Sequence, residues 1–188
     1  MVVTVGSGTS GSGGLVQAHA GRSTVHTGGE VHVSSGEGTA TSSGAITIRS
    51  VNAGAAGTSG YLSFSSGSSV TGNSGYIHMG TGVATAGRGG MVLISVGSGT
   101  SSVGGMVQAH AGRSTVHTGG AVVVTSGEGT ATSSGVVLIR SSNSGEAGVS
   151  GSLLFSSGTS VTGNSGRVHM GTGAATAGRG GAVVVTVG

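Results

Sequence analysis

The sequence predicts an all-β protein: a single-domain β-solenoid of the parallel β-helix kind, with about twelve 15-residue coils. Three observations lead to this prediction. A short pattern recurs along the whole chain, every copy of it ends on glycine, and apolar residues occupy the second and fourth positions after that glycine. Each coil is expected to hold two short strands around a thin, two-layer core. Residues 1–188 would then form one continuous solenoid.

The composition allows a thin core only. The 188 residues include 44 glycines but just two phenylalanines and two tyrosines, with no proline, cysteine or tryptophan. Such a chain cannot fill a thick globular interior at native packing density. Yet 35% of the residues are hydrophobic, which is more than a solvated linker of glycine and serine carries. We therefore expect the apolar residues to be buried in a repeating pattern.

Repetition also occurs over a longer interval. The segment from Gln17 to Gly29 recurs unchanged from Gln108 to Gly120, an interval of 91 residues (108 − 17). This interval defines internal repeats 1–90 and 91–181, and residues 182–188 begin a third copy. The block 91–181 contains five 15-residue repeats and one 16-residue repeat, which ends at Gly151. The block 1–90 has the same order, with its 16-residue repeat ending at Gly60, and residue 1 stands at the second position of its first repeat.

The last residue of each repeat is called its closing glycine, and positions are numbered from the residue that follows the previous closing glycine. The closing glycines are Gly14, Gly29, Gly44, Gly60, Gly75, Gly90, Gly105, Gly120, Gly135, Gly151, Gly166 and Gly181. Position two is Val16, Val31, Ile46, Leu62, Ile77, Val92, Val107, Val122, Val137, Leu153, Val168 and Val183. Position four is Ala18, Val33, Ile48, Phe64, Met79, Ile94, Ala109, Val124, Ile139, Phe155, Met170 and Val185. Two apolar columns two residues apart predict a strand whose positions two and four face the core.

A turn and a second strand are expected later in each repeat. Position seven is glycine except in the 16-residue repeats, where Asn52 and Asn143 follow an inserted residue. Because glycine and asparagine best tolerate positive φ, this position predicts a left-handed turn. Small residues at positions nine and eleven, such as Ser23 and Val25, are then expected to face the core from the second strand.

The sequence indicates no enzyme, no metal and no cofactor. All seven basic residues are arginines and all four acidic residues are glutamates, so neither a P-loop lysine nor a catalytic aspartate is available. A serine nucleophile needs a base and an orienting group in one pocket, and a thin rod offers none. The seven histidines are expected to lie on the outward face.

The distribution of charged and apolar residues indicates which kinds of partner the chain can bind. Sparse arginines give a net charge of +3 without the basic cluster that nucleic-acid binding requires. No apolar stretch approaches the length of a membrane span, so no membrane insertion is predicted. Stacked coils would place Arg22 beside Glu37 and Arg113 beside Glu128, as opposite charges on neighbouring coils. The expected partner is the chain itself, by end-to-end or lateral association.

A self-association face is predicted from the outward positions of the first strand. Apolar residues at these positions mark an interaction surface. They are Met91, Leu93, Met106, Val123, Val136, Leu138, Leu154, Tyr61 and Tyr76.

Position ten carries a column of threonines that suggests a different function. The column consists of Thr9, Thr24, Thr39, Thr85, Thr100, Thr115, Thr130 and Thr176. Regular threonines on a flat solenoid are similar to those of insect-type ice-binding proteins. Ala55, Val70, Glu146 and Val161 interrupt the column. The similarity makes ice binding the alternative function to a structural role, in spite of these interruptions.

The repeat pattern, for example Val31-His32-Val33-Ser34-Ser35-Gly36 followed by Ser43-Gly44, resembles the Gly/Ser/Thr-rich β-solenoid arrays of large microbial surface and filament proteins. The resemblance covers the whole chain and concerns architecture alone. It implies an extracellular or cell-surface location. It also implies a structural module of a filament, fibre or surface spacer, which assembles through open solenoid ends and an apolar sheet face.

Overall fold

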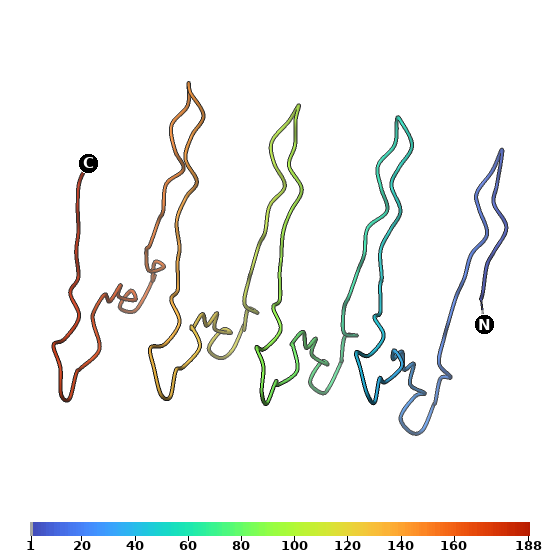
Figure 1. Cartoon of the computed structure of the whole chain (residues 1–188), viewed down its shortest axis with the longest axis horizontal. Coiled ribbons are helices and arrows are strands. Elements are labelled where there is room, and N and C mark those ends of the chain that lie inside the picture. Colours follow the sequence, from blue (N-terminus) through green and yellow to red (C-terminus); the bar gives the residue numbers. More distant parts are fainter. Residues whose placement is uncertain (1) are drawn as a thin grey trace. The chain divides into compact units, whose positions relative to one another are not determined.

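The computed structural model describes residues 2–188, and these residues form no helix and no strand. The predicted β-solenoid is therefore wrong, because no sheet joins one repeat to the next. The chain instead alternates between extended segments and bends (Figure 1). The local structure recurs from repeat to repeat.

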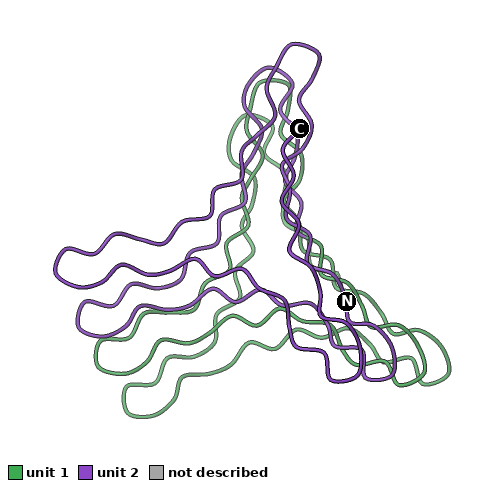
Figure 2. Ribbon diagram, turned by 90° about the vertical axis from the view of Figure 1, so that its left-hand side faces the viewer, with its two compact units in different colours: residues 1–93 green, residues 94–188 purple. Residues whose placement is uncertain are grey.

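The chain divides into two units, Met1–Leu93 and Ile94–Gly188. Within each unit, the backbone runs out and back in narrow loops (Figure 2). The two sides of a loop are held together at a few points only, by hydrogen bonds within one repeat.

One bend falls in each repeat, at positions ten to twelve. The bends are 9–11, 24–26, 39–41, 70–72, 85–87, 100–102, 115–117, 130–132, 161–163 and 176–178, and 55–57 and 146–148 begin with a two-residue turn. They recur at the interval of the repeat, with one additional residue where Val51 or Ser142 is inserted. The predicted second strand is therefore wrong: the residues assigned to it form the tip of a loop. Val25, expected in the core, is 80% exposed at the centre of such a bend.

Among the described residues, a hydrogen bond closes the loop behind the bend in eight of the twelve repeats. In five repeats the amide of the closing glycine donates to the carbonyl oxygen at position seven, with N···O distances of 2.8–2.9 Å; an example is Gly44 to Gly36. In three others, the hydroxyl at position six donates to the carbonyl oxygen of the closing glycine, as Ser50 Oγ does to Gly60 at 2.8 Å. Each bond joins residues of one repeat. The loop is therefore a local structure that needs no neighbouring repeat.

The closing glycine is required by the side chain at position six. A Cβ added to it would lie 2.9–3.4 Å from that side chain in eleven repeats, and Gly105 would meet Val96 more closely still. Carbon atoms in van der Waals contact lie about 3.5–4.0 Å apart. The residues at position six are Val5, Ala20, Ser35, Ser50, Ser66, Thr81, Val96, Ala111, Ser126, Ser141, Ser157 and Thr172. Close approach of the two sides of the loop therefore explains why glycine ends every repeat.

Replacement of one closing glycine tests this explanation. We expect Gly44→Ala to weaken the Gly44–Gly36 bond, because the new Cβ would lie 3.3 Å from the Cβ of Ser35. The protection of that amide against hydrogen exchange should fall about fivefold, corresponding to about 1 kcal/mol for one hydrogen bond. Gly36→Ala is the control, because no atom lies within 4 Å of its added Cβ. Equal loss in both variants would contradict the explanation.

The left-handed turn predicted at position seven is wrong. No residue of 2–188, glycine or not, has positive φ. Asn52 and Asn143 thus occupy position seven without the positive φ that asparagine tolerates. Neither positive φ nor a close contact accounts for glycine at this position, since no atom lies within 4 Å of a Cβ added to Gly36 or to any other glycine at position seven.

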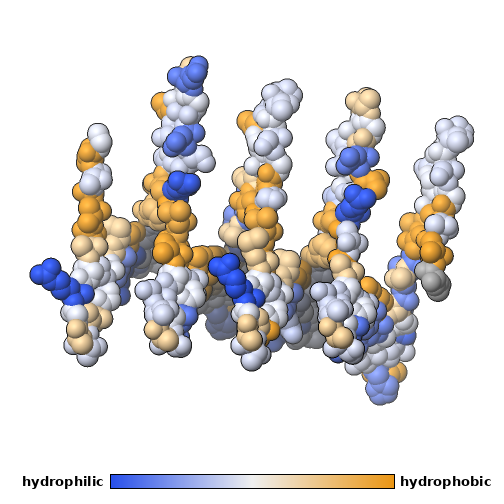
Figure 3. All heavy atoms as spheres, in the orientation of Figure 1, coloured by the Kyte–Doolittle hydropathy of each residue, from blue (hydrophilic) through white to orange (hydrophobic). Residues whose placement is uncertain are grey.

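The predicted thin core is wrong as well, because no described hydrophobic residue is buried. Val31 and Val122, expected to face inward, are 57% and 62% exposed. The chain exposes 18701 Å² in all. A folded monomer of 17.4 kDa exposes roughly 7,900 Å² and its unfolded chain roughly 25,000 Å². Apolar side chains accordingly lie along the outside of the loops, between polar ones (Figure 3).

The predicted alternation of side chains nevertheless leaves a trace. Residues at position two are 47–62% exposed and the large hydrophobic residues at position four are 58–80% exposed, whereas the nine residues assigned to the self-association face are 71–89% exposed. An extended backbone sends successive side chains to opposite sides. The period of two therefore sorts side chains into two sides, but nothing covers either side.

Candidate self-association surface

The predicted association residues lie in the extended segments that precede the loops. They occupy positions one and three, and all are exposed. Tyr61, Tyr76, Met91 and Leu93 belong to the first unit. Met106, Val123, Val136, Leu138 and Leu154 belong to the second. The structure thus presents each of these side chains to solvent, at position one or three of its own repeat.

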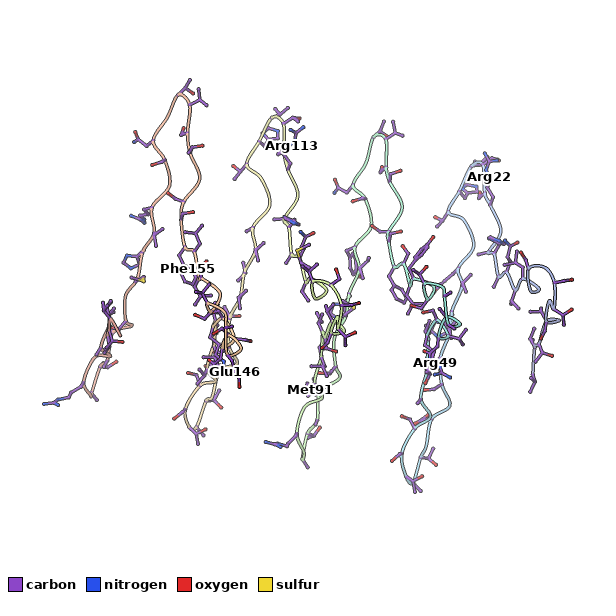
Figure 4. All side chains as sticks on the ribbon, turned by 90° about the horizontal axis from the view of Figure 1, so that it is seen from above. Arg22, Arg49, Met91, Arg113, Glu146 and Phe155 are labelled. Atoms are coloured by element: carbon purple, nitrogen blue, oxygen red, sulfur yellow. The ribbon has the colours of Figure 1, made fainter. Side chains whose placement is uncertain are left out.

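The backbone of these segments is unpaired. None of the backbone–backbone hydrogen bonds of the described residues involves positions one to four. In Figure 4 the side chains stand away from the ribbon, among them Met91 and Phe155. An extended segment with free N–H and C=O groups and apolar side chains is a template for pairing with another extended chain.

The threonine column lies at the loop tips. Each of the eight threonines is the first residue of a bend, and all are exposed. The flat sheet on which such a column was expected is absent from residues 2–188. The threonines therefore share a place in the repeat without sharing a strand face.

Serine at position nine shapes several of these tips. Ser23 Oγ accepts a hydrogen bond from the amide of His26 at 2.9 Å, and Ser114 Oγ does the same for His117. Ser69 and Ser160 accept from Gly72 and Gly163 at 3.0 and 3.1 Å. Side-chain oxygens of serine commonly stabilise turns in this way. The sequence-based prediction missed this role, although a serine just before each of these bends is a recognisable turn signal.

Charged side chains lie at position eight of four repeats, two residues before the bend. Arg22 and Glu37 belong to the first unit, and Arg113 and Glu128 to the second. All four are exposed, and Figure 4 shows Arg22 and Arg113 near the ends of narrow loops. The stacked coils that would have placed each arginine beside a glutamate of the next repeat are absent, so that expectation loses its basis.

The best-defined hollow is shallow and local. Its volume is about 140 Å³, and it is lined by Arg140, Ser141, Ser142 and Asn143. These four consecutive residues surround the insertion of the second 16-residue repeat. They combine a cation with hydroxyls and an amide, but they include neither a carboxylate nor a histidine to act as a base.

No group of three or more histidine, aspartate or glutamate residues within 2–188 is placed to hold a metal ion. The same residues contain no helix long and apolar enough to cross a membrane.

Comparison with known proteins gives no relative: no family model, no curated protein and no solved structure matches the chain.

Proposed function

We propose that this chain is a structural repeat module of an extracellular filament, fibre or surface spacer, and that it assembles with copies of itself. The observation that carries the proposal is the exposure of the apolar side chains: the least exposed of the large hydrophobic residues, Val5, is still 46% exposed. Exposed apolar residues in such number mark an association surface.

Association would recover free energy that the single chain does not. Full burial of one valine, leucine or isoleucine side chain contributes about 1.5–3 kcal/mol. No described apolar side chain is buried within the chain, so this contribution is available to an interface. The repeat makes the surface periodic, and a periodic surface favours extended assemblies over a single closed contact.

The residue chemistry also supports a structural role. The loops bring together hydroxyls, backbone groups and isolated charges, and no acid lies beside a histidine and a serine at the one hollow described above. The extracellular location rests on the resemblance of the repeat pattern to those of microbial surface and filament proteins.

Sedimentation velocity and electron microscopy of the whole chain test the proposal. We expect a monomer at low concentration, and fibres or lateral assemblies above a critical concentration. A chain that remains monomeric over the whole range of solubility would overturn the proposal. Thermal hysteresis measured on the same samples tests the alternative: activity that Thr100→Leu and Thr115→Leu abolish would establish ice binding through the threonine column.

A further inference from the structure

We infer that copies of this chain associate side by side, in parallel and displaced by one repeat, so that Arg22 and Arg113 of one copy face Glu37 and Glu128 of the next. This inference rests on the proposed function, since it specifies the partner and the alignment of that association. It is carried by the placement of the four solvent-accessible charges at the same position of the repeat.

Alignment without displacement is unfavourable. Every charged side chain would then face its own counterpart, so that all seven arginines and all four glutamates would meet like charges. Like charges directly opposite each other destabilise neighbouring extended chains. A displacement of one repeat removes every such encounter, because no repeat carries the same charge at the same position as the repeat after it.

At any other displacement, fewer of the arginines at position eight face a glutamate of the neighbouring copy. Arg22 faces Glu37 at a displacement of one repeat and Glu128 at a displacement of seven repeats. Arg113 faces Glu128 at a displacement of one repeat, and it faces Glu37 at a displacement of five repeats in the opposite direction. One repeat is therefore the only displacement at which both arginines face glutamates. The apolar columns still coincide there, because position two of each repeat meets position two of the next, as Val16 meets Val31.

An antiparallel alignment loses the apolar contacts. It can oppose Arg22 to Glu128 and Arg113 to Glu37, because both pairs of numbers sum to 150. Position two would then face position fourteen, which is glycine or serine in every repeat; Val16, for example, would face Ser134. Only the parallel alignment joins charge complementarity to apolar burial.

The displacement also accounts for open-ended growth. A copy displaced by one repeat presents to a third copy the same surface that it met on the first. Such a contact is heterologous, and a heterologous contact that does not close into a ring continues as a filament.

Neutralising Arg22 and Arg113 tests the alignment, because the displaced alignment predicts a higher critical concentration for assembly and the undisplaced alignment a lower one. We expect Arg22→Gln with Arg113→Gln to raise the critical concentration for assembly about tenfold at low ionic strength, since two exposed ion pairs per copy are lost. Arg49→Gln with Arg140→Gln is the matched control. It removes the same net charge from position five, where a displacement of one repeat opposes serine or threonine, and its critical concentration should stay near that of the wild type.

A charge exchange provides the second measurement. The variants Arg22→Glu with Arg113→Glu, and Glu37→Arg with Glu128→Arg, should each assemble poorly alone, and their equimolar mixture should assemble as the wild type does. The inference is overturned if the variant with Arg22→Gln and Arg113→Gln assembles as well as the wild type or better. Better assembly is the result that an undisplaced alignment requires, because the substitutions would then remove contacts between like charges. In that case wild-type assembly still supports the proposed function. A wild-type chain that never assembles would overturn both.

Discussion

A chain carrying Val123→His, Leu138→Thr and Leu154→Ser is expected to lose most of its self-association, with a critical concentration about a hundredfold above that of the wild type. The three side chains are 74–86% exposed and lie at position three of extended segments. Each loses roughly 1 kcal/mol of its burial on assembly, and about 1.4 kcal/mol corresponds to a factor of about ten. Sedimentation velocity at a series of concentrations measures the effect.

The chain supplies its own control for this experiment. The introduced residues are those found at the same positions of the first block, namely His32, Thr47 and Ser63. The reverse exchange, His32→Val with Thr47→Leu and Ser63→Leu, should lower the critical concentration by a similar factor. Neither set alters a closing glycine or a residue at position six, so the loops should persist in both. Unchanged assembly in both variants would show that these side chains lie outside the interface.

Backbone amides of the extended segments are expected to exchange with solvent at nearly unfolded rates in the dilute chain and about a thousandfold more slowly in the assembly. The reason is that positions one to four form no backbone–backbone hydrogen bonds in the single chain. Pairing between copies would protect them from opening and exchange. Hydrogen exchange followed by mass spectrometry, below and above the critical concentration, measures the difference.

The loop-closing amides serve as an internal reference. Gly44 and Gly135 donate to Gly36 and Gly127 at 2.9 Å within their own repeats. Their modest protection should be present at both concentrations and should change less than that of the extended segments. Strong protection of positions one to four in the dilute chain would contradict the structure, because it would require those amides to be paired within one chain.

The interval at which local structure recurs could be predicted from the sequence, but the place of the bend within the repeat could not. The regular spacing of the closing glycines matches one bend in every repeat, including those at 55–57 and 146–148 that follow the inserted residues. Serine at position nine accepts a hydrogen bond from the bend in four repeats, at Ser23, Ser69, Ser114 and Ser160. The other eight repeats carry glycine or alanine at that position and still bend at positions ten to twelve, so no single residue type marks the bend in every repeat.

Burial could not be predicted in the same way. The alternation of Val31, His32 and Val33 determines which side chains share a side of an extended segment. It does not determine the distance to the next segment, and burial depends on that distance. Val25, for example, was expected to face the core from a second strand, but it lies at the tip of a loop. The residues at positions two and four therefore do not pack against it.

The candidate surface could be predicted only as a set of residues. The nine apolar residues are exposed in the structure, and that exposure is compatible with an interface without identifying what it binds. The four charges at position eight predict contacts inside one chain only if the repeats stack. The sequence pattern is the same whether the complementary charges meet within one chain or, as we propose, between chains.

Loop closure within a single repeat has a consequence for the length of the array. Every hydrogen bond among the described residues joins positions no more than ten apart. Inserting or deleting one whole repeat therefore leaves all remaining loops intact, whereas removing half a repeat separates a closing glycine from the side chain it faces. Arrays of this kind tolerate changes of size in complete repeats, and their length can vary without a change in the local structure.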